Sequence, residues 1–295
     1  MAAKAKAADE PIVEEIHFRS ESAFLCLLLN RRNKFIRVID FRAGALPAKR
    51  LFIQSVAKRE GVQKVITLVE KDEVSSWTRV GFVREGTIPG FYKRSDGHLC
   101  GCVIGEKTAS IEVSDKGVKL TDRTINAAKK AALDIPEEIK GASIHEVEAL
   151  EALEARDAAV KKGLTLNTFD NFGRDAERFY YDTALRRGKV NYLAAEYQDC
   201  FGHSLLEVLR SPTTDNEIVA LTAGMRLMCE DLKDRGIIST FGFAPNDDVA
   251  LATAYVAAGF RKTGLLARGI QVGDEHKDAI LWTRKLANPG IDDDN

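Results

Sequence analysis

The sequence lacks an excess of charge of either sign. Its 295 residues include 43 Lys and Arg against 44 Asp and Glu. A nucleic-acid-binding face or a polybasic membrane patch needs clustered cations that dominate their surroundings. We therefore expect neither nucleic acid nor a membrane as a partner.

Long apolar runs are also missing. The longest, AFLCLLL at residues 23–29, is far shorter than the roughly 20 residues that cross a bilayer. The opening MAAKAKAADEP has no apolar core of the kind found in a secretory signal. We expect residues 1–13 to form a disordered tail, and we expect the same of the acidic end at 289–295.

Cysteines are few, odd in number and scattered. The five are Cys26, Cys100, Cys102, Cys200 and Cys229. Without an export signal, an odd set of this kind is most simply explained by free thiols in a reducing compartment, which predicts a cytoplasmic protein. The length is sufficient for two domains that each bury a core.

One succession of elements occurs twice. In the N-terminal half we expect a strand, a helix, a strand, a helix and a strand pair at 34–41, 48–61, 62–70, 71–82 and 87–105. In the C-terminal half we expect the same order at 204–210, 217–236, 237–244, 247–260 and 261–286. WTRVGFVREG at 77–86 and YVAAGFRKTG at 255–264 share one frame, an aromatic residue followed by Gly-Phe and then Gly. The sequence therefore predicts an internal repeat.

The middle of the chain has a different composition. Residues 106–163 are rich in Ala, Glu and Lys, and 143–163 has helical periodicity with Ser143 as the expected N-cap. We interpret 106–163 as a helical connector between an N-terminal domain at 14–105 and a C-terminal domain at 164–288. A partner-binding helix is the alternative. Residues 173–188, which contain Tyr180 and Tyr181, are expected to form the first helix of the second domain.

Several of these stretches resemble a known family. They are NKFIRVID (33–40), FVREGTIPGFYK (82–93), DAERFYYD (175–182), AAGFRKTGLLARGI (257–270) and ILWTRKL (280–286). Together they resemble the GNAT superfamily of acyl-CoA-dependent N-acyltransferases, and within it the two-domain β-lysine N-acetyltransferases. The resemblance extends from about residue 14 to 286, except for the middle helices. It implies an α/β fold with two GNAT-like domains in tandem, of which the first is degenerate.

The resemblance also implies catalytic roles. Tyr255 falls on the position of the tyrosine that protonates the leaving thiolate, whereas its counterpart Trp77 has no hydroxyl. Glu207 lies on the strand that often supplies a general base. The alternatives are that Tyr255 is a core aromatic packed beside Phe260 and that Glu207 is a carboxylate at the edge of the sheet.

The cofactor turn of the family is altered in this sequence. Its equivalent is VALTAG at 219–224, so the resemblance places CoA pyrophosphate at Val219, Ala220, Thr222, Ala223 and Gly224. Thr222 stands where the family has a glycine, and Asp215 and Glu217 add charge of the wrong sign. The stretch at 41–50 has Gly44 but is interrupted by Pro47. Asp248 stands where the family has an asparagine, and its alternative role is that of an N-cap.

A possible metal motif is HLCGC. On a strand, His98, Cys100 and Cys102 would project from one face and could ligate zinc. No fourth ligand is visible, so a half-buried strand is the preferred interpretation and we predict no metal site.

Two functions remain. The first is transfer of an acetyl group from acetyl-CoA to a small primary amine, with the N-terminal half as a structural wall. The second is a catalytically inactive scaffold or protein-interaction module, with a protein partner or a homo-oligomer. An acyl donor that needs no pyrophosphate turn is a third possibility. An electropositive pocket at 219–224 would support an enzyme, and an acidic or filled one would support the scaffold.

Overall fold

The computed structural model describes residues 10–21, 24–42, 46–105, 111–186, 188–198 and 201–288. Gly44, Cys200 and most of the two predicted tails lie outside the described residues. No helix of the described part is long and apolar enough to cross a membrane.

The N-terminal half supplies six strands and two helices. They are β1 (Val13–Arg19), β2 (Phe24–Asn30), β3 (Phe35–Arg42), α1 (Leu46–Arg59), β4 (Lys64–Val69), α2 (Val74–Arg79), β5 (Val83–Ile88) and β6 (Gly97–Val103). Strand β4 is buried at every position, as its run of β-branched residues predicts. Helix α1 is followed by Gly61, whose φ of 65° lets the chain leave the helix and enter β4.

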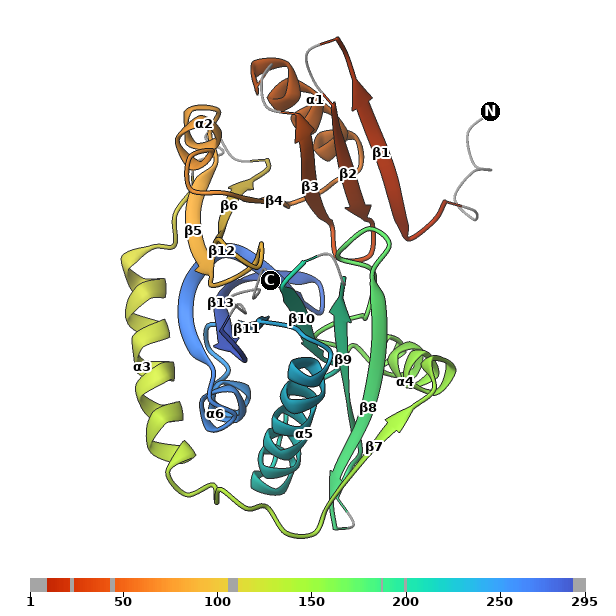
Figure 1. The fold of residues 1–295 in the computed structure, drawn as a ribbon, viewed down its shortest axis with the longest axis vertical. Coiled ribbons are helices and arrows are strands. Elements are labelled where there is room, and N and C mark those ends of the chain that lie inside the picture. Colours follow the sequence, from red (N-terminus) through yellow and green to blue (C-terminus); the bar gives the residue numbers. More distant parts are fainter. Residues whose placement is uncertain are drawn as a thin grey trace, which may run out of the picture.

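The rest of the chain supplies seven strands and four helices. They are α3 (Asp115–Ala132), β7 (Ala142–Val147), α4 (Ala149–Lys161), β8 (Glu177–Leu185), β9 (Asn191–Tyr197), β10 (His203–Val208), α5 (Asp215–Asp234), β11 (Ser239–Pro245), α6 (Val249–Ala257), β12 (Arg261–Val272) and β13 (Glu275–Lys285). Helix α3 packs against α6, α6 against α5, and α5 against β8, so these helices cover one side of the C-terminal strands (Figure 1).

All thirteen strands form one sheet, in the order β1-β2-β3-β4-β6-β5-β12-β13-β11-β10-β9-β8-β7. Outward from the contact between β5 and β12, the two arms have the same connectivity. One arm runs β5, β6, β4, β3, β2, β1 and the other runs β12, β13, β11, β10, β9, β8, with β7 added at its edge. In each arm a parallel pair is followed by antiparallel strands. The repeated element order read from the sequence is therefore present in the sheet.

One predicted helix is wrong, and a second begins six residues later than predicted. Residues 177–185 form strand β8, which pairs with β7 and β9, instead of a helix over 173–188. Tyr180 and Tyr181 are buried there, but on opposite faces of a strand rather than on one face of a helix. Ser143 is not an N-cap, because it lies within β7; α4 begins only at Ala149. The connector is therefore helix, strand and helix.

Candidate functional site

Strands β10 and β11 part from one another in the middle of the C-terminal arm. They pair in parallel only from His203–Ser239 to Leu205–Phe241. Beyond that point β10 continues on β9 and β11 continues on β13. Leu206–Val208 and Gly242–Pro245 therefore border a gap between the two strands. The Val208 carbonyl already accepts from the Asn167 side chain at 2.8 Å, so an extended ligand could pair only with the remaining backbone groups.

Tyr255 stands at this gap. It lies on α6 and is fully buried, and its hydroxyl has no hydrogen-bond partner among the described residues. The ring stacks on Trp282, with centroids 5.6 Å apart and planes at 4°. A Cβ at Gly242 would collide with the Tyr255 hydroxyl and would lie 2.6 Å from the carbonyl oxygen of Leu206. The Tyr255 hydroxyl therefore points toward the place where β10 and β11 separate. It fits there because Gly242 has no side chain.

Burial sets the protonation state of this phenol. It raises the pKa of Tyr255 far above the usual value for a tyrosine, and the charge of Glu207 adds to the effect. Tyr255 is therefore protonated throughout the physiological range. A group in this state can give a proton to an anion but cannot act as a base.

The frame at 77–86 forms the same local structure as that at 255–264. Trp77 meets Phe82 edge to face at 4.9 Å and 77°, and Tyr255 meets Phe260 at 5.1 Å and 77°. The amide of Phe82 donates to the Trp77 carbonyl as that of Phe260 donates to Tyr255. The two aromatic residues are thus equivalent in position, and only Tyr255 has a hydroxyl to offer.

Glu207 lies on β10 beside the gap, in a network of buried charges. Its carboxylate is 2.8 Å from the guanidinium of Arg178, which also holds Glu196 at 2.6 Å. Burial raises the pKa of Glu207 to about 7, against the opposing charge of Arg178. A carboxylate with this pKa can accept a proton near neutral pH, as a general base must.

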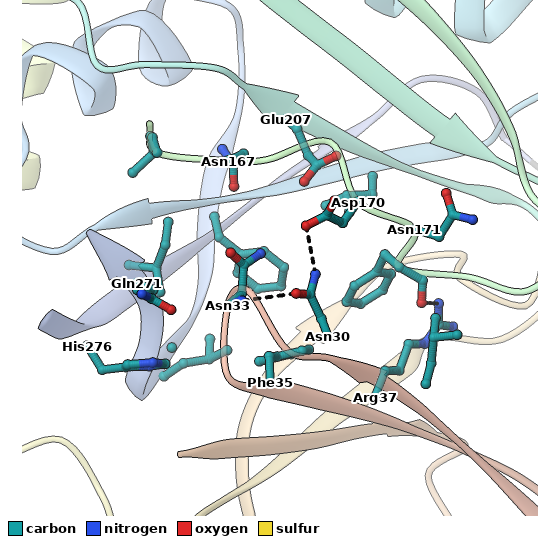
Figure 2. A pocket seen from close by; sticks show the side chains of 18 of the residues that line it. Asn30, Asn33, Phe35, Arg37, Asn167, Asp170, Asn171, Glu207, Gln271 and His276 are labelled. Atoms are coloured by element: carbon teal, nitrogen blue, oxygen red, sulfur yellow. Dashed lines mark hydrogen bonds between the residues drawn. The ribbon is translucent and has the colours of Figure 1, made fainter. Parts of the chain in front are cut away.

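A cavity of about 90 Å³ lies next to Glu207 (Figure 2). Its polar wall comes from segments far apart in the sequence. Asn30 reaches in from the end of β2, Asn33 from the loop between β2 and β3, and Asp170 from the segment after α4. Asn30 donates to Asp170 at 3.1 Å and accepts from the amide of Asn33 at 2.9 Å. The predicted site included Glu207 but none of these three residues, since no local motif marks them.

The predicted pyrophosphate turn is not a turn. Val219, Ala220, Thr222, Ala223 and Gly224 all lie inside α5, which begins four residues before Val219. Their backbone amides belong to the helix, and a Cβ at Gly224 would lie 2.7 Å from Leu193. The prediction was wrong because the apolar positions of the helix continue N-terminally through this stretch, to a cap at Thr214.

The actual amino end of α5 is capped by the protein itself. The Thr214 side chain accepts from the amide of Glu217, and the Glu217 carboxylate accepts from the amide of Thr213 at 2.6 Å. This is a variant of the capping box, because the carboxylate accepts from the amide of the residue before the N-cap and not from that of the N-cap itself. Burial alone would raise the pKa of Glu217, but the Thr213 hydrogen bonds outweigh it and lower that pKa. A carboxylate therefore occupies the position where a helix end would attract a ligand anion.

Asp248 serves as the N-cap of α6. Its side chain accepts from the amide of Leu251 at 2.9 Å and from the Ser211 hydroxyl. The Ser211 contact joins the loop before α5 to the start of α6. Of the two roles considered for Asp248, the structure shows the capping role.

The HLCGC motif does form a strand, β6. Cys100 and Cys102 are buried in the N-terminal core, and burial raises the pKa of both thiols to about 12. His98 lies 3.3 Å from the Thr87 hydroxyl. Among the described residues, these three do not form a group with metal-ligand spacing.

No family model matches the sequence, and no curated protein matches it. Solved structures do. Spermidine N-acetyltransferase from Vibrio cholerae, in complex with CoA and spermine, aligns with 51% of this chain and 99% of its own, with 6% identity and a TM-score of 0.40. The ribosomal-protein-S18-alanine N-acetyltransferase from Escherichia coli aligns with 51% and 97%, with 14% identity and a TM-score of 0.38. The chain is thus similar, over about half its length, to solved N-acetyltransferases.

Proposed function

We propose that the chain transfers an acetyl group from acetyl-CoA to a small primary amine, at the point where β10 and β11 part. The observation that carries the proposal is the buried, unpaired hydroxyl of Tyr255 beside Gly242. An unpaired buried hydroxyl costs the fold free energy, so its position needs a reason. A role in donating a proton to a thiolate in the gap would explain this position.

The remaining parts of the site fit the same reaction. Glu207 and Asp170 give the cavity two carboxylates that attract a cationic amine. Glu207 accepts a proton from the ammonium, and the free amine forms the new C–N bond at the thioester carbonyl. As the C–S bond breaks, Tyr255 gives its proton to the leaving sulfur, and the second proton that the nitrogen loses as the amide forms restores the Tyr255 hydroxyl. Atoms and charge balance, and no metal is needed for the step.

The comparison of the two halves suggests a supporting role for the N-terminal half. We propose two GNAT-like domains at 14–105 and 164–288, joined by 106–163, with the first domain inactive because Trp77 cannot donate a proton from a hydroxyl. Asn30 and Asn33 of that domain wall the cavity. The free thiols of Cys26, Cys100, Cys102 and Cys229 suit a reducing compartment, and we place the protein in the cytoplasm.

A second candidate is an inactive scaffold or protein-interaction module. The capping box at the amino end of α5 favours it, because Glu217 opposes a pyrophosphate there. An acyl donor that lacks the nucleotide would avoid this conflict. The two candidates therefore differ in whether any thioester binds at the gap between β10 and β11.

Calorimetry with acetyl-CoA and with S-acetylpantetheine, which lacks the nucleotide pyrophosphate, separates them. Micromolar binding, about −8 kcal/mol, that is lost in Gly242→Ala supports the enzyme. Leu133→Ala is the control, since the Leu133 side chain is 85% exposed. Binding of S-acetylpantetheine alone would assign a donor without the nucleotide. Absence of heat with both ligands would refute acyl transfer and favour the scaffold.

A further inference from the structure

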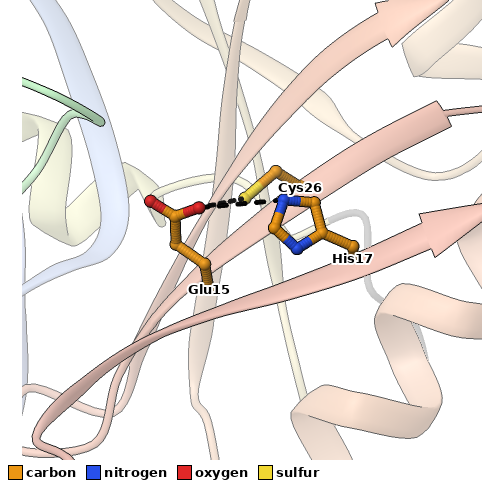
Figure 3. Close-up of side chains that lie close together, drawn as sticks. All are labelled: Glu15, His17 and Cys26. Atoms are coloured by element: carbon orange, nitrogen blue, oxygen red, sulfur yellow. Dashed lines mark hydrogen bonds and ion pairs between the residues drawn. The ribbon is translucent and has the colours of Figure 1, made fainter.

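A histidine, a cysteine and a glutamate meet on one face of the edge strand β1 and its neighbour β2 (Figure 3). The strands pair antiparallel, with His17 opposite Cys26 and Glu15 two residues from His17 on the same strand. Side chains two apart on a strand, and side chains directly opposite across a pair, point to the same side of the sheet. The sheet register therefore brings together residues that no sequence motif connects.

The distances match those of a metal site. The Sγ atom of Cys26 is 3.9 Å from Oε2 of Glu15, and Nε2 of His17 is 3.7 Å from the same oxygen. All three ligand atoms lie within 4.8 Å of one another. Tetrahedral zinc, with bonds of roughly 2.0–2.3 Å, sets its ligand atoms about 3.3–3.6 Å apart. Small movements of these side chains would bring the three ligand atoms from their present separations to those of a tetrahedral zinc site.

The surroundings orient the ligands. Arg174 lies 2.9 Å from Oε2 of Glu15, so the carboxylate is held by a neighbouring group, as metal-bound carboxylates commonly are. Phe24 stacks against the His17 ring, with centroids 6.1 Å apart and planes at 17°. The charge of Arg174 also opposes a cation, which limits the affinity of the site.

Access is one-sided. Cys26 is fully buried, whereas about a third of the His17 and Glu15 side chains remains exposed. An ion can therefore enter from solvent and reach the sulfur beneath. A thiol releases its proton to solvent when it binds a metal ion as the thiolate.

We propose that Glu15, His17 and Cys26 bind a divalent metal ion of the zinc class, with a fourth position open to water. One thiolate, one imidazole and one carboxylate suit zinc better than calcium or magnesium, which prefer oxygen alone. The ion would tie the edge strand β1 to β2. This site is separate from the proposed acetyl-transfer site and does not depend on it.

The test is titration of the full chain, without a histidine tag, with Co²⁺ and then with Zn²⁺. Cobalt should bind at one equivalent and give a sulfur-to-cobalt charge-transfer absorption, which Zn²⁺ then abolishes by displacement. Cys26→Ser should remove the absorption, and Cys102→Ser, which changes another buried cysteine, should keep it.

His17→Ala is the second variant, since its side chain is partly exposed and its loss leaves the core intact. We expect it to weaken binding at least tenfold. His145→Ala is the matched control, because His145 also lies on an edge strand beside a carboxylate, 3.0 Å from Asp182, but has no thiol near it in the described structure. No cobalt–sulfur absorption in the unmodified protein, or an affinity that His17→Ala leaves unchanged, would overturn the proposal.

Discussion

Gly86 of β5 and Gly264 of β12 face each other where the two arms of the sheet meet. They are also the corresponding residues of the two repeated frames, each nine residues after its aromatic residue, Trp77 or Tyr255. A Cβ on Gly264 would lie 2.5 Å from the carbonyl oxygen of Glu85 and 2.7 Å from Cα of Gly86. The arms can therefore approach this closely only because both residues lack a side chain.

Replacement of Gly264 should loosen this junction. In Gly264→Ala the new methyl group meets backbone atoms that cannot move aside, and we expect a loss of roughly 1–3 kcal/mol in the free energy of unfolding. Gly86→Ala should cost less, because its nearest contact is the side-chain Cδ2 of Leu281 at 2.7 Å. Urea unfolding of both variants measures which one loses more free energy of unfolding. Equal stability of Gly264→Ala and the unmodified protein would contradict the expected loss at this junction.

A buried ion pair stabilises the same junction. The ammonium of Lys64 lies 2.6 Å from Glu85 Oε1 and donates to the carbonyl of Ala267 on β12 at 2.8 Å. Lys64→Met leaves the Glu85 carboxylate buried without its cation, and we expect it to cost about 3–5 kcal/mol. Lys64→Met combined with Glu85→Leu should recover most of that loss, since no unpaired charge remains.

Chemical unfolding of the single and double variants tests this coupling. Lys140→Met is the control, because its pair with Glu138 is exposed and contributes little. A double variant as unstable as Lys64→Met would show that the loss comes from packing rather than from the unpaired carboxylate.

The repeated elements were predictable, because their signals are local. Helices α1, α5 and α6 have apolar residues at helical spacing and end near Gly61, Gly236 and Gly259, each with positive φ. Strand β8 was not. Its Phe179, Tyr180 and Tyr181 are consecutive, so they match neither a strict two-residue nor a helical period. It is buried on both faces, by α5 on one side and by α4 on the other, which only the tertiary structure reveals.

The sequence signals that point to the proposed site are continuous stretches of chain. Tyr255 was singled out because its frame recurs at Trp77 and because it falls on a catalytic position of the family that the sequence resembles; its role stays a prediction. The cavity wall was not predicted, since Asn30 and Asn33 are about 140 residues away from Asp170 in the sequence and hydrogen bonds join the two segments only in the folded chain. The turn at 219–224 was misplaced because the resemblance fixed its position by counting, while the capping box at Thr214 starts the helix earlier.

Removal of the Tyr255 hydroxyl should separate stability from activity. In Tyr255→Phe the unpaired buried hydroxyl disappears, so we expect the free energy of unfolding to be unchanged or to rise by about 1 kcal/mol. Acetyl transfer should fall by about 10²–10⁴-fold, because the thiolate then has no proton donor. Tyr192→Phe is the control, since that hydroxyl contacts Glu151 at 3.2 Å near the surface. Full activity in Tyr255→Phe would show that Tyr255 is not the general acid.

The capping box at α5 should limit binding of the nucleotide. Glu217→Gln keeps the shape of the side chain but removes its negative charge near the amino end of the helix. If acetyl-CoA places its pyrophosphate there, we expect its affinity to rise severalfold, while that of S-acetylpantetheine stays constant. Equal changes for both ligands would show that the pyrophosphate lies elsewhere. Calorimetry on the same two donors measures the difference.

Glu207 should give the protein a pH dependence near neutrality. The pKa of Glu207 is raised from 4.5 to about 7 in the folded protein. Between these values the unfolded carboxylate has lost its proton while the folded one keeps it, so the free energy of unfolding falls as pH rises from about 4.5 to 7. Above 7 both states are ionised and this contribution stays constant.

The proposed reaction depends on pH in the opposite direction. Glu207 accepts a proton only when ionised, so kcat/KM for acetyl transfer should increase with pH and level off above about 7. In Glu207→Gln both effects should disappear together, the fall in stability and the rise in rate, while Arg178 keeps its contact with Glu196. Urea unfolding and initial rates at pH 5 to 9 measure the two. A variant that loses the stability effect but keeps the pH–rate profile would show that another group is the base.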